Sequence, residues 1–148
     1  MQFTIHSIGS IHRSDGKVLV CVDPVYRTGL QGIGGHSHIV VYWWALDNDS
    51  EAVRQTLLVH PKPLPDAIMG VFATRSPRRP NLIMATTCRL LKVDEDKGVL
   101  EIENIDAFDG TPLIDIKCYS PGIDRVAGKV RSPWKIEHEH IPDGGVSP

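Results

Sequence analysis

Short apolar runs rich in β-branched residues alternate with Gly, Pro, Asp and Asn along almost the whole chain. This rhythm is typical of strands that are joined by tight turns. Asp15-Gly16 and Lys97-Gly98 lie where hairpin turns are needed. The predicted strands are 3–11, 17–22, 38–44, 56–60, 69–74, 83–93, 99–104, 113–119 and 135–138. The sequence therefore predicts an all-β protein.

Helix is scarce in this pattern. The best candidate is 50–55, where Ser50 can cap a first turn that contains Glu51 and Arg54 on one face, and a second turn is expected near 120–125. A chain of 148 residues has the size of one domain. A small single-domain β-barrel with very little helix leaves few exposed sheet edges, and a β-sandwich is the alternative. We assign 1–142 to this domain and 143–148 to a flexible C-terminal tail.

Composition narrows the class of protein further. No apolar run approaches the roughly 18 residues needed to cross a bilayer, and the first residues lack the layout of a signal peptide, so we expect a cytoplasmic protein without a membrane partner. The net charge of −2 argues against broad, nonspecific binding of nucleic acids. Three cysteines are scattered in apolar stretches, and we expect small buried side chains rather than disulfides.

The segment 70–81 is a basic loop that directly follows an apolar run. It contains Arg75, Arg78 and Arg79 together with two prolines. Prolines stiffen the backbone, and guanidinium groups projecting from a stiff loop bind carboxylates or phosphates. The alternative for an isolated Arg-Arg pair is a solvated basic turn.

A second candidate motif is Asp109-Gly110-Thr111-Pro112. Asp and Gly suit tight backbone geometry, so an isolated motif of this kind is most often only a turn. Its carboxylate and exposed backbone groups are nevertheless suited to bind ribose hydroxyls or the amino group of adenine.

Three ordered motifs together resemble one known family. Segment 70–81 resembles a signature of the TsaA-like family, also called the tRNA methyltransferase O family, and 106–117 resembles its second signature. Segments 29–33 and 36–41 resemble its early Ser-His strand, and 8–11 fits its opening. The resemblance is to the shorter members and covers about residues 3 to 121. It implies a small β-barrel enzyme that uses S-adenosylmethionine to methylate N6 of threonylcarbamoyladenosine at position 37 of tRNA.

The resemblance also implies roles for individual residues. Arg75 would pair with the carboxylate of the methionine part of the cofactor, and Arg78 and Arg79 would face a phosphate of the RNA substrate, although the sequence alone does not divide these roles among the three arginines. The residues that the resemblance assigns to cofactor binding are Leu46, Arg75, Asn81, Ala85, Asp109, Gly110, Thr111 and Pro112.

Methyl transfer needs an aligned acceptor rather than a covalent nucleophile, although a base helps to remove the proton from N6. Asp109, Asp115 and Tyr119 are the candidates by motif, and the sequence does not choose among them. No metal site is expected, because the pair His36 and His38 is better read as part of a structural strand.

The chain departs from the family pattern at several places. Leu82-Ile83-Met84 replaces the usual Pro-Ile-Gly, Ala45-Leu46 replaces an aromatic-His pair, and the Pro-Arg-Gln loop of longer members is missing. Cofactor binding is therefore better supported than the tRNA substrate. A small-molecule or peptide acceptor and a noncatalytic S-adenosylmethionine- or nucleotide-binding protein remain alternatives. The family also implies a homodimer, for which Trp43 and Trp44 are candidate anchors.

Overall fold

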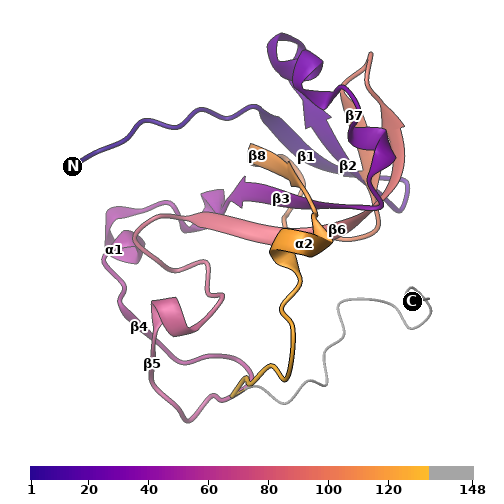
Figure 1. Ribbon diagram of the computed structural model, residues 1–148. Helices are drawn as coiled ribbons and strands as arrows, with labels where there is room; N and C mark the ends of the chain where they lie inside the picture. The colour runs from indigo at the N-terminus through magenta and orange to yellow at the C-terminus, as the bar shows by residue number, and fades with distance from the viewer. Residues whose placement is uncertain (134–148) are drawn as a thin grey trace.

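The computed structural model describes residues 1–133 of the chain. Six strands close an antiparallel barrel in the order β1-β2-β7-β6-β3-β8 (Figure 1). They are β1 (Gly9–Ser14), β2 (Lys17–Val22), β3 (His38–Trp44), β6 (Ile83–Asp94), β7 (Val99–Ile102) and β8 (Thr111–Cys118). The predicted all-β barrel is confirmed.

The core of the barrel follows from the alternation of side chains along each strand. Ile11, Val20, Ile39, Val41 and Leu100 point inward and are fully buried. Each such side chain stabilises the fold by about 1.5–3 kcal/mol relative to an exposed one. Polar and half-exposed residues occupy the alternate positions, which form the outer face of the barrel.

Both predicted hairpin turns are present. Asp15 and Gly16 have φ angles of 51° and 74°, the left-handed geometry of a type I′ turn between β1 and β2. Gly98 has a φ of 69° at the turn between β6 and β7. The turn residues therefore set the register of the strands on either side.

A smaller lobe is inserted between β3 and β6 and lies below the barrel in Figure 1. A two-stranded sheet forms its centre. The predicted helix at 50–55 is confirmed as α1, because Ser50 Oγ accepts a hydrogen bond from Val53 N–H at 3.3 Å. The elements of the lobe are η3 (Leu46–Asn48), α1 (Glu51–Arg54), β4 (Leu58–Val59), β5 (Met69–Gly70) and η4 (Val71–Ala73).

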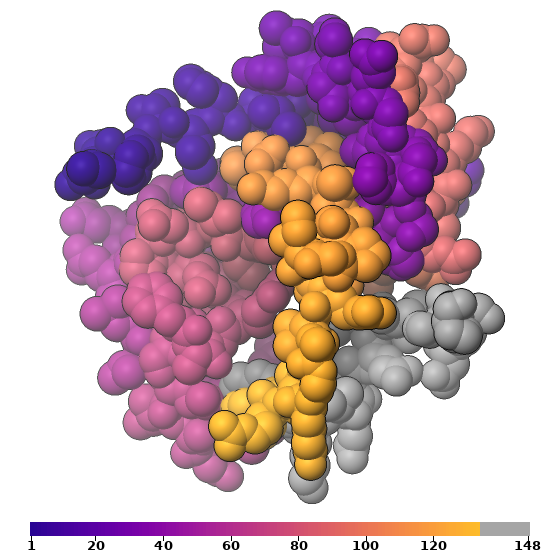
Figure 2. Space-filling view, in the orientation of Figure 1, coloured from indigo at the N-terminus to yellow at the C-terminus, as the bar shows by residue number. Residues whose placement is uncertain are grey.

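The remaining helical turns lie outside the lobe. Two 3-10 segments, η1 (Pro24–Leu30) and η2 (Ile33–Gly35), connect β2 to β3, and α2 (Pro121–Asp124) follows β8. Figure 2 shows the chain after β8 running as a narrow strip across the front of the molecule, and residues 121–133 are exposed throughout.

Several strand predictions differ from the structure, and the strand predicted at 56–60 is reduced to Leu58–Val59. The strand predicted at 3–11 begins only at Gly9, and the first residues form an extended arm away from the barrel, with Phe3 79% exposed (Figure 1). The alternating pattern was misleading there because no neighbouring strand pairs with the arm. The strand predicted at 69–74 ends at Gly70, where η4 begins. Segment 135–138 and the tail 143–148 lie outside the described residues.

The two adjacent tryptophans point to opposite faces of β3. Trp43 is buried in the barrel and its Nε1–H donates to Thr86 Oγ1 at 3.1 Å, whereas Trp44 faces outward and donates to Asp49 Oδ2 at 2.9 Å. Trp43 is therefore not available as an anchor between subunits, which corrects that part of the prediction.

All three cysteines are free thiols. Cys88 is buried, and burial raises the pKa of its thiol to about 12, so it is unreactive at neutral pH. Burial also raises the pKa of the half-buried Cys21. Cys118 is exposed, so the prediction of a buried side chain is wrong for this residue. Within residues 1–133 no helix is both long and apolar enough to cross a bilayer.

Candidate functional site

The Asp109–Pro112 turn leads directly into β8. Gly110 has a φ of 77°, which favours glycine, and its N–H donates to the carbonyl of Ile11 at 2.8 Å. Thr111 is buried and pairs with Ile11 on β1, so it faces the core rather than solvent. The turn is thus fixed to β1 and presents Asp109 at the surface.

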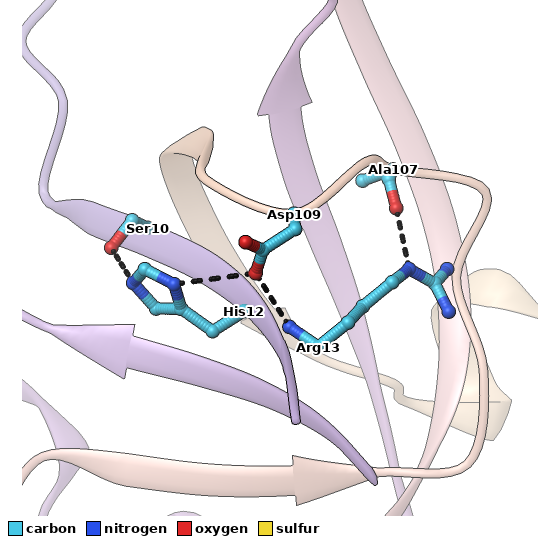
Figure 3. Close-up of polar contacts among 5 residues, drawn as sticks. All are labelled: Ser10, His12, Arg13, Ala107 and Asp109. Carbon is cyan, nitrogen blue, oxygen red and sulfur yellow. Dashed lines mark hydrogen bonds and ion pairs between the residues drawn. The ribbon is translucent and has the colours of Figure 1, made fainter. Parts of the chain in front are cut away.

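Two neighbouring residues of β1 contact the carboxylate of Asp109 (Figure 3). Its Oδ1 accepts a hydrogen bond from the backbone N–H of Arg13 at 2.8 Å and lies 3.5 Å from His12 Nδ1. The other ring nitrogen of His12 lies 2.8 Å from Ser10 Oγ. The second oxygen of Asp109, Oδ2, has no partner within residues 1–133, and the side chain is 64% exposed. That oxygen is free to accept a hydrogen bond from a ligand.

Arg13 shapes the loop that precedes this turn. Its guanidinium donates to the carbonyl of Ala107 at 3.0 Å and to the carbonyl of Ile105. Neither His12 nor Arg13 was predicted from the sequence. Their contacts join residues more than 90 positions apart, and the only signal was their place directly after the family-like segment 8–11.

The basic loop is folded on itself by its small hydroxyl residues. Thr74 is buried and its Oγ1 donates to the carbonyl of Val71 at 3.0 Å, while accepting the N–H of Ser76 at 3.2 Å. Ser76 Oγ in turn accepts the N–H of Arg78 at 3.2 Å. These bonds between hydroxyl and backbone groups hold the turn from Thr74 to Arg78.

The three arginines of the loop have different surroundings. Arg75 is exposed, and its Nη2 donates to the carbonyl of Ala85 on β6, which leaves other guanidinium N–H groups available. Arg78 is exposed, and the Nη1 of Arg79 donates to the carbonyl of Ser76 at 3.2 Å. None of the three pairs with an acidic residue in the described part of the chain. Their positive charges are therefore available to an anionic ligand.

The two motifs are attached to the two strands that flank β3. Ala85 on β6 and Asp115 on β8 both pair with Tyr42 on β3, so they flank it on the outer face. Strands two positions apart in a sheet lie about 10 Å from each other. Arg75 is bonded to Ala85 on one flank, and the Asp109–Pro112 turn begins the strand on the other. Leu46, 53% exposed, lies just beyond the end of β3, and Asn81 is exposed just before β6.

The structure separates the three candidate bases along β8. Asp109 precedes the strand, Asp115 lies within it, and Tyr119 follows its last residue. Eight strand residues span about 23 Å, so these groups do not converge. Asp115 is the one that shares the outer face with Tyr42 and Ala85, whereas the Tyr119 ring contacts the ring of His38.

The segment that departs from the family pattern is partly core. Leu82 is fully buried, Met84 packs against the core, and Ile83 is 41% exposed. His36 lies before β3 rather than within it. Among residues 1–133 no group of three or more His, Cys, Asp or Glu side chains is arranged to hold a metal ion.

Comparison with known proteins gives a consistent result. The family model described as the tRNA-methyltransferase O N-terminal domain matches residues 8–125. A probable S-adenosyl-L-methionine-binding protein of Methanocaldococcus jannaschii is 36% identical over 123 residues, which cover 82% of this chain and 96% of the relative. A mouse tRNA (adenine(37)-N6)-methyltransferase is 46% identical over 95 residues, which cover 64% of this chain and 21% of that protein.

The fold agrees with the sequence comparison. The crystal structure of TrmO from Pseudomonas aeruginosa matches with a TM-score of 0.66 and 26% identity, over 90% of this chain and 62% of that one. The chain thus spans less than two thirds of the solved TrmO chain. The family match includes both the basic loop and the Asp109–Pro112 turn. This chain belongs to the family of the tRNA-methyltransferase O N-terminal domain, a family of S-adenosylmethionine-dependent methyltransferases.

Proposed function

We propose that this protein transfers a methyl group from S-adenosylmethionine to N6 of threonylcarbamoyladenosine at position 37 of tRNA. The observation that carries the proposal is that the two strands flanking β3 each carry one of two complementary groups, Arg75 bonded to β6 and Asp109 just before β8. Arg75 offers a guanidinium without an acidic partner in the described chain, and Asp109 offers a free carboxylate oxygen across β3. S-adenosylmethionine carries a carboxylate at its methionine end and hydroxyls on its central ribose, so it offers a partner to each of the two groups.

The donor set fits the cofactor chemically. The free N–H groups of Arg75 would hold the carboxylate of the methionine part, and Asp109 Oδ2 would accept a ribose hydroxyl. Leu46 and Ala85 present apolar surface beside them, and Asn81 adds an amide. When bound, S-adenosylmethionine supplies an electrophilic methyl group. The protein's own task is then to align the acceptor nitrogen behind that methyl group and to exclude water.

Two further roles concern the methyl acceptor, namely binding of the tRNA and removal of the proton from N6. Arg78 projects into solvent from the basic loop and would bind a phosphate of the tRNA, with Arg79 next to it. N6 loses a proton on methylation, and of the three candidate bases Asp115 is the one that lies across β3 from Ala85, to which Arg75 is bonded. We therefore assign the proton-accepting role to Asp115.

A second copy of the chain would complete the site. The predicted cofactor residues Leu46, Arg75, Asn81 and Asp109 are all exposed in the single chain, whereas methyl transfer requires water to be excluded. The homodimer expected from the family resemblance would cover this face.

The test is mass spectrometry of modified nucleosides in tRNA from a deletion strain. The methylated form of threonylcarbamoyladenosine is expected to disappear and the unmethylated form to accumulate. The parent gene should restore the methylated form, and a gene carrying Arg75→Ala should not. An unchanged nucleoside profile in the deletion strain would contradict the tRNA substrate.

A noncatalytic S-adenosylmethionine-binding protein is the second candidate. The archaeal relative that the chain matches over nearly its full length is named as a binding protein rather than an enzyme. Binding of S-adenosylhomocysteine by the purified protein, together with an unchanged tRNA profile and no methyl transfer to tRNA in vitro, would favour this candidate. Transfer of labelled methyl to a small molecule or peptide would instead favour the acceptor suggested by the altered segment 82–84.

A further inference from the structure

The outer face of the sheet formed by β6, β3 and β8 continues beyond the candidate cofactor site. Ile39 and Val41 are buried in the core, so the residues that alternate with them on β3, and the partners of those residues on β6 and β8, share the outer face. They form three rows: Ala85, Tyr42 and Asp115 in the first, Thr87, Val40 and Lys117 in the second, and Arg89, His38 and Tyr119 in the third. The first row carries the proposed base and the carbonyl that holds Arg75, and the third lies about 13 Å further along the sheet.

Two cations in the second and third rows lack an acidic partner. Arg89 and Lys117 are exposed on the strands that flank β3, and neither forms an ion pair with any residue from 1 to 133. Strand geometry places their Cα atoms about 12 Å apart. The Nζ of Lys117 lies 5.8 Å from the centre of the Tyr42 ring. Two acidic residues border this part of the face: Glu103, whose N–H donates to the carbonyl of Arg89 at 3.1 Å, and Asp115, which precedes Lys117 on β8. Neither neutralises a cation by direct pairing, so both positive charges are available to an anionic ligand.

Aromatic and small side chains lie between these two cations. The rings of Tyr119 and His38 pack edge to face, with their centroids 6.2 Å apart. Thr87 and Val40, in the row between this pair and the candidate cofactor site, have short side chains. Proteins bind single-stranded RNA with surfaces of this kind, on which bases stack against aromatic rings while neighbouring cations neutralise the phosphates. The combination of unpaired cations and aromatic rings therefore favours a single-stranded polyanion over an uncharged partner.

We propose that the second and third rows of this face bind the single-stranded anticodon loop of the tRNA. Arg89 and Lys117 hold phosphates of nucleotides that flank the methylated adenosine, and Tyr119 contacts a neighbouring base. The inference rests on the proposed function, because it takes the row of Ala85 and Asp115 as the place of the reacting adenine. A loop that follows β3 from this row brings the next nucleotides over the two cations.

The experiment is filter binding of the full-length protein to tRNA purified from the deletion strain, at several salt concentrations. Loss of one phosphate contact with a single strand reduces the slope of log affinity against log salt by about 0.7. Arg89→Gln and Lys117→Gln should each show this reduction, and the double variant about twice as much. Arg89→Lys keeps the charge and should keep the parental slope. Tyr119→Leu should instead lower the affinity about fivefold or more at every salt concentration and leave the slope unchanged, because stacking does not release counterions.

Lys17→Gln is the matched control, because it removes an exposed cation from β2, which lies across the barrel from β3; its slope should equal that of the parent. Affinity for S-adenosylhomocysteine should be parental in every variant, which separates loss of RNA contacts from loss of the fold. If the parent binds tRNA in a salt-dependent manner and the double variant keeps the parental affinity and slope, this inference is overturned and the proposed function stands. A parent without salt-dependent binding of tRNA would overturn the proposed function and the inference with it.

Discussion

Arg75 is the single side chain on which the proposed cofactor site depends most. Its exposed guanidinium is tied to the carbonyl of Ala85 and lacks an acidic partner in residues 1–133. Arg75→Ala should weaken binding of S-adenosylhomocysteine by about 1.5–3 kcal/mol, the range for a hydrogen bond to a charged group. Calorimetry at pH 7.5 measures this change directly.

Two further variants separate charge from geometry. Arg75→Lys keeps the positive charge but loses the two-pronged donor, so its affinity should fall between those of the parent and the alanine variant. Arg125→Ala removes an exposed arginine after α2 and should bind like the parent. Equal affinity of the parent and Arg75→Ala would remove Arg75 from the site.

The contrast between Arg75 and His12 shows what the sequence contains about the site. Arg75 lies in a dense local motif, so the chemistry of the loop was readable from twelve consecutive residues. The roles of His12 and Arg13 depend on contacts with a segment more than 90 residues away, and no local pattern predicts such contacts. The separation of Asp109 from Tyr119, in contrast, was readable, because the predicted turn at 109–112 and strand at 113–119 place them at opposite ends of one strand.

At the scale of the elements, the pairing of β1 with β2 depends on the absence of a side chain at Gly9. A Cβ placed there would lie 1.9 Å from the carbonyl oxygen of Cys21, which belongs to the neighbouring strand and cannot move without breaking the ladder. Gly9→Ala should therefore lower the free energy of unfolding by about 3 kcal/mol or more, the upper part of the range for overpacking. Urea denaturation gives the value.

Gly29→Ala is the matched control for this prediction. Gly29 lies in η1, and a Cβ there would meet nothing within 4 Å. Its substitution should change stability by no more than about 0.5 kcal/mol. Similar stabilities of the two variants would mean that β1 and β2 do not approach as closely as described.

The hydrogen bonds through Asp49 that link β3 to α1 should depend on pH. Hydrogen bonds from Arg54 and then from Trp44 lower the pKa of the Asp49 carboxyl below its ordinary value. A group whose pKa is lower in the folded state contributes stability above its ordinary pKa, and that contribution is lost as the pH falls through the folded value. The link should therefore persist at neutral pH and weaken below about pH 4.

The indole N–H resonance of Trp44 reports this loss, since it donates directly to Asp49. In Asp49→Asn the resonance should lose its acid titration. Asp94, whose pKa is lowered by its hydrogen bonds with Lys97, titrates in the same range at the opposite end of β6. Asp94→Asn should therefore leave the Trp44 titration intact, and loss of that titration in this variant would contradict the assignment.

The strand predictions succeeded where hydrophobic alternation and a partner strand coincided. Residues 17–22 and 38–44 were predicted with their observed bounds, because each is confined by turn residues and buries one face. The arm containing Phe3 and Ile5 has the same alternation but no partner, so the pattern alone was insufficient. In the lobe, the structure after Gly70 is determined by the hydrogen bonds of Thr74. The sequence pattern counts Thr74 only as a β-branched residue and therefore predicts a strand there.

At the scale of the whole molecule, the lobe carries an apolar surface that a single chain leaves exposed. Leu57, Leu58, Ile68 and Phe72 are 59%, 65%, 64% and 78% exposed. Because such side chains gain stability on burial, we expect them to contribute to the proposed homodimer. Light scattering at micromolar concentration should report about twice the chain mass of 16.4 kDa.

Charge-introducing variants test which surface is used. Phe72→Glu should shift the protein toward the monomer, whereas Val25→Glu, at an equally exposed apolar residue of η1, should not. A strictly monomeric parent would contradict the dimer and would leave the candidate cofactor residues open to solvent.

Recognition of the proposed tRNA substrate depends on the charge of the whole molecule. The chain has a net charge of −2, so any binding of tRNA must rely on a local patch, and the basic loop is the densest one. Each phosphate contact that is lost should reduce the slope of log affinity against log salt by about one. Arg78→Ala should show that reduction most clearly, because its exposed side chain has no bond within the described residues, whereas Arg79 also holds the carbonyl of Ser76.

Filter binding of tRNA at two or more salt concentrations measures the slope for the parent, Arg78→Ala and the double variant with Arg79→Ala. Lys97→Ala is the matched control, since Lys97 is an exposed cation beyond the opposite end of β6 and pairs with Asp94 at 3.4 Å. The slope of this control should equal that of the parent. Affinity for S-adenosylhomocysteine should change little in the Arg78 variants, because the proposed contact of the cofactor carboxylate is Arg75. If the parent shows no salt-dependent binding of tRNA, the proposed tRNA substrate is wrong. The methyl acceptor would then be a molecule without a phosphate backbone, because the proposed cofactor contacts do not include Arg78.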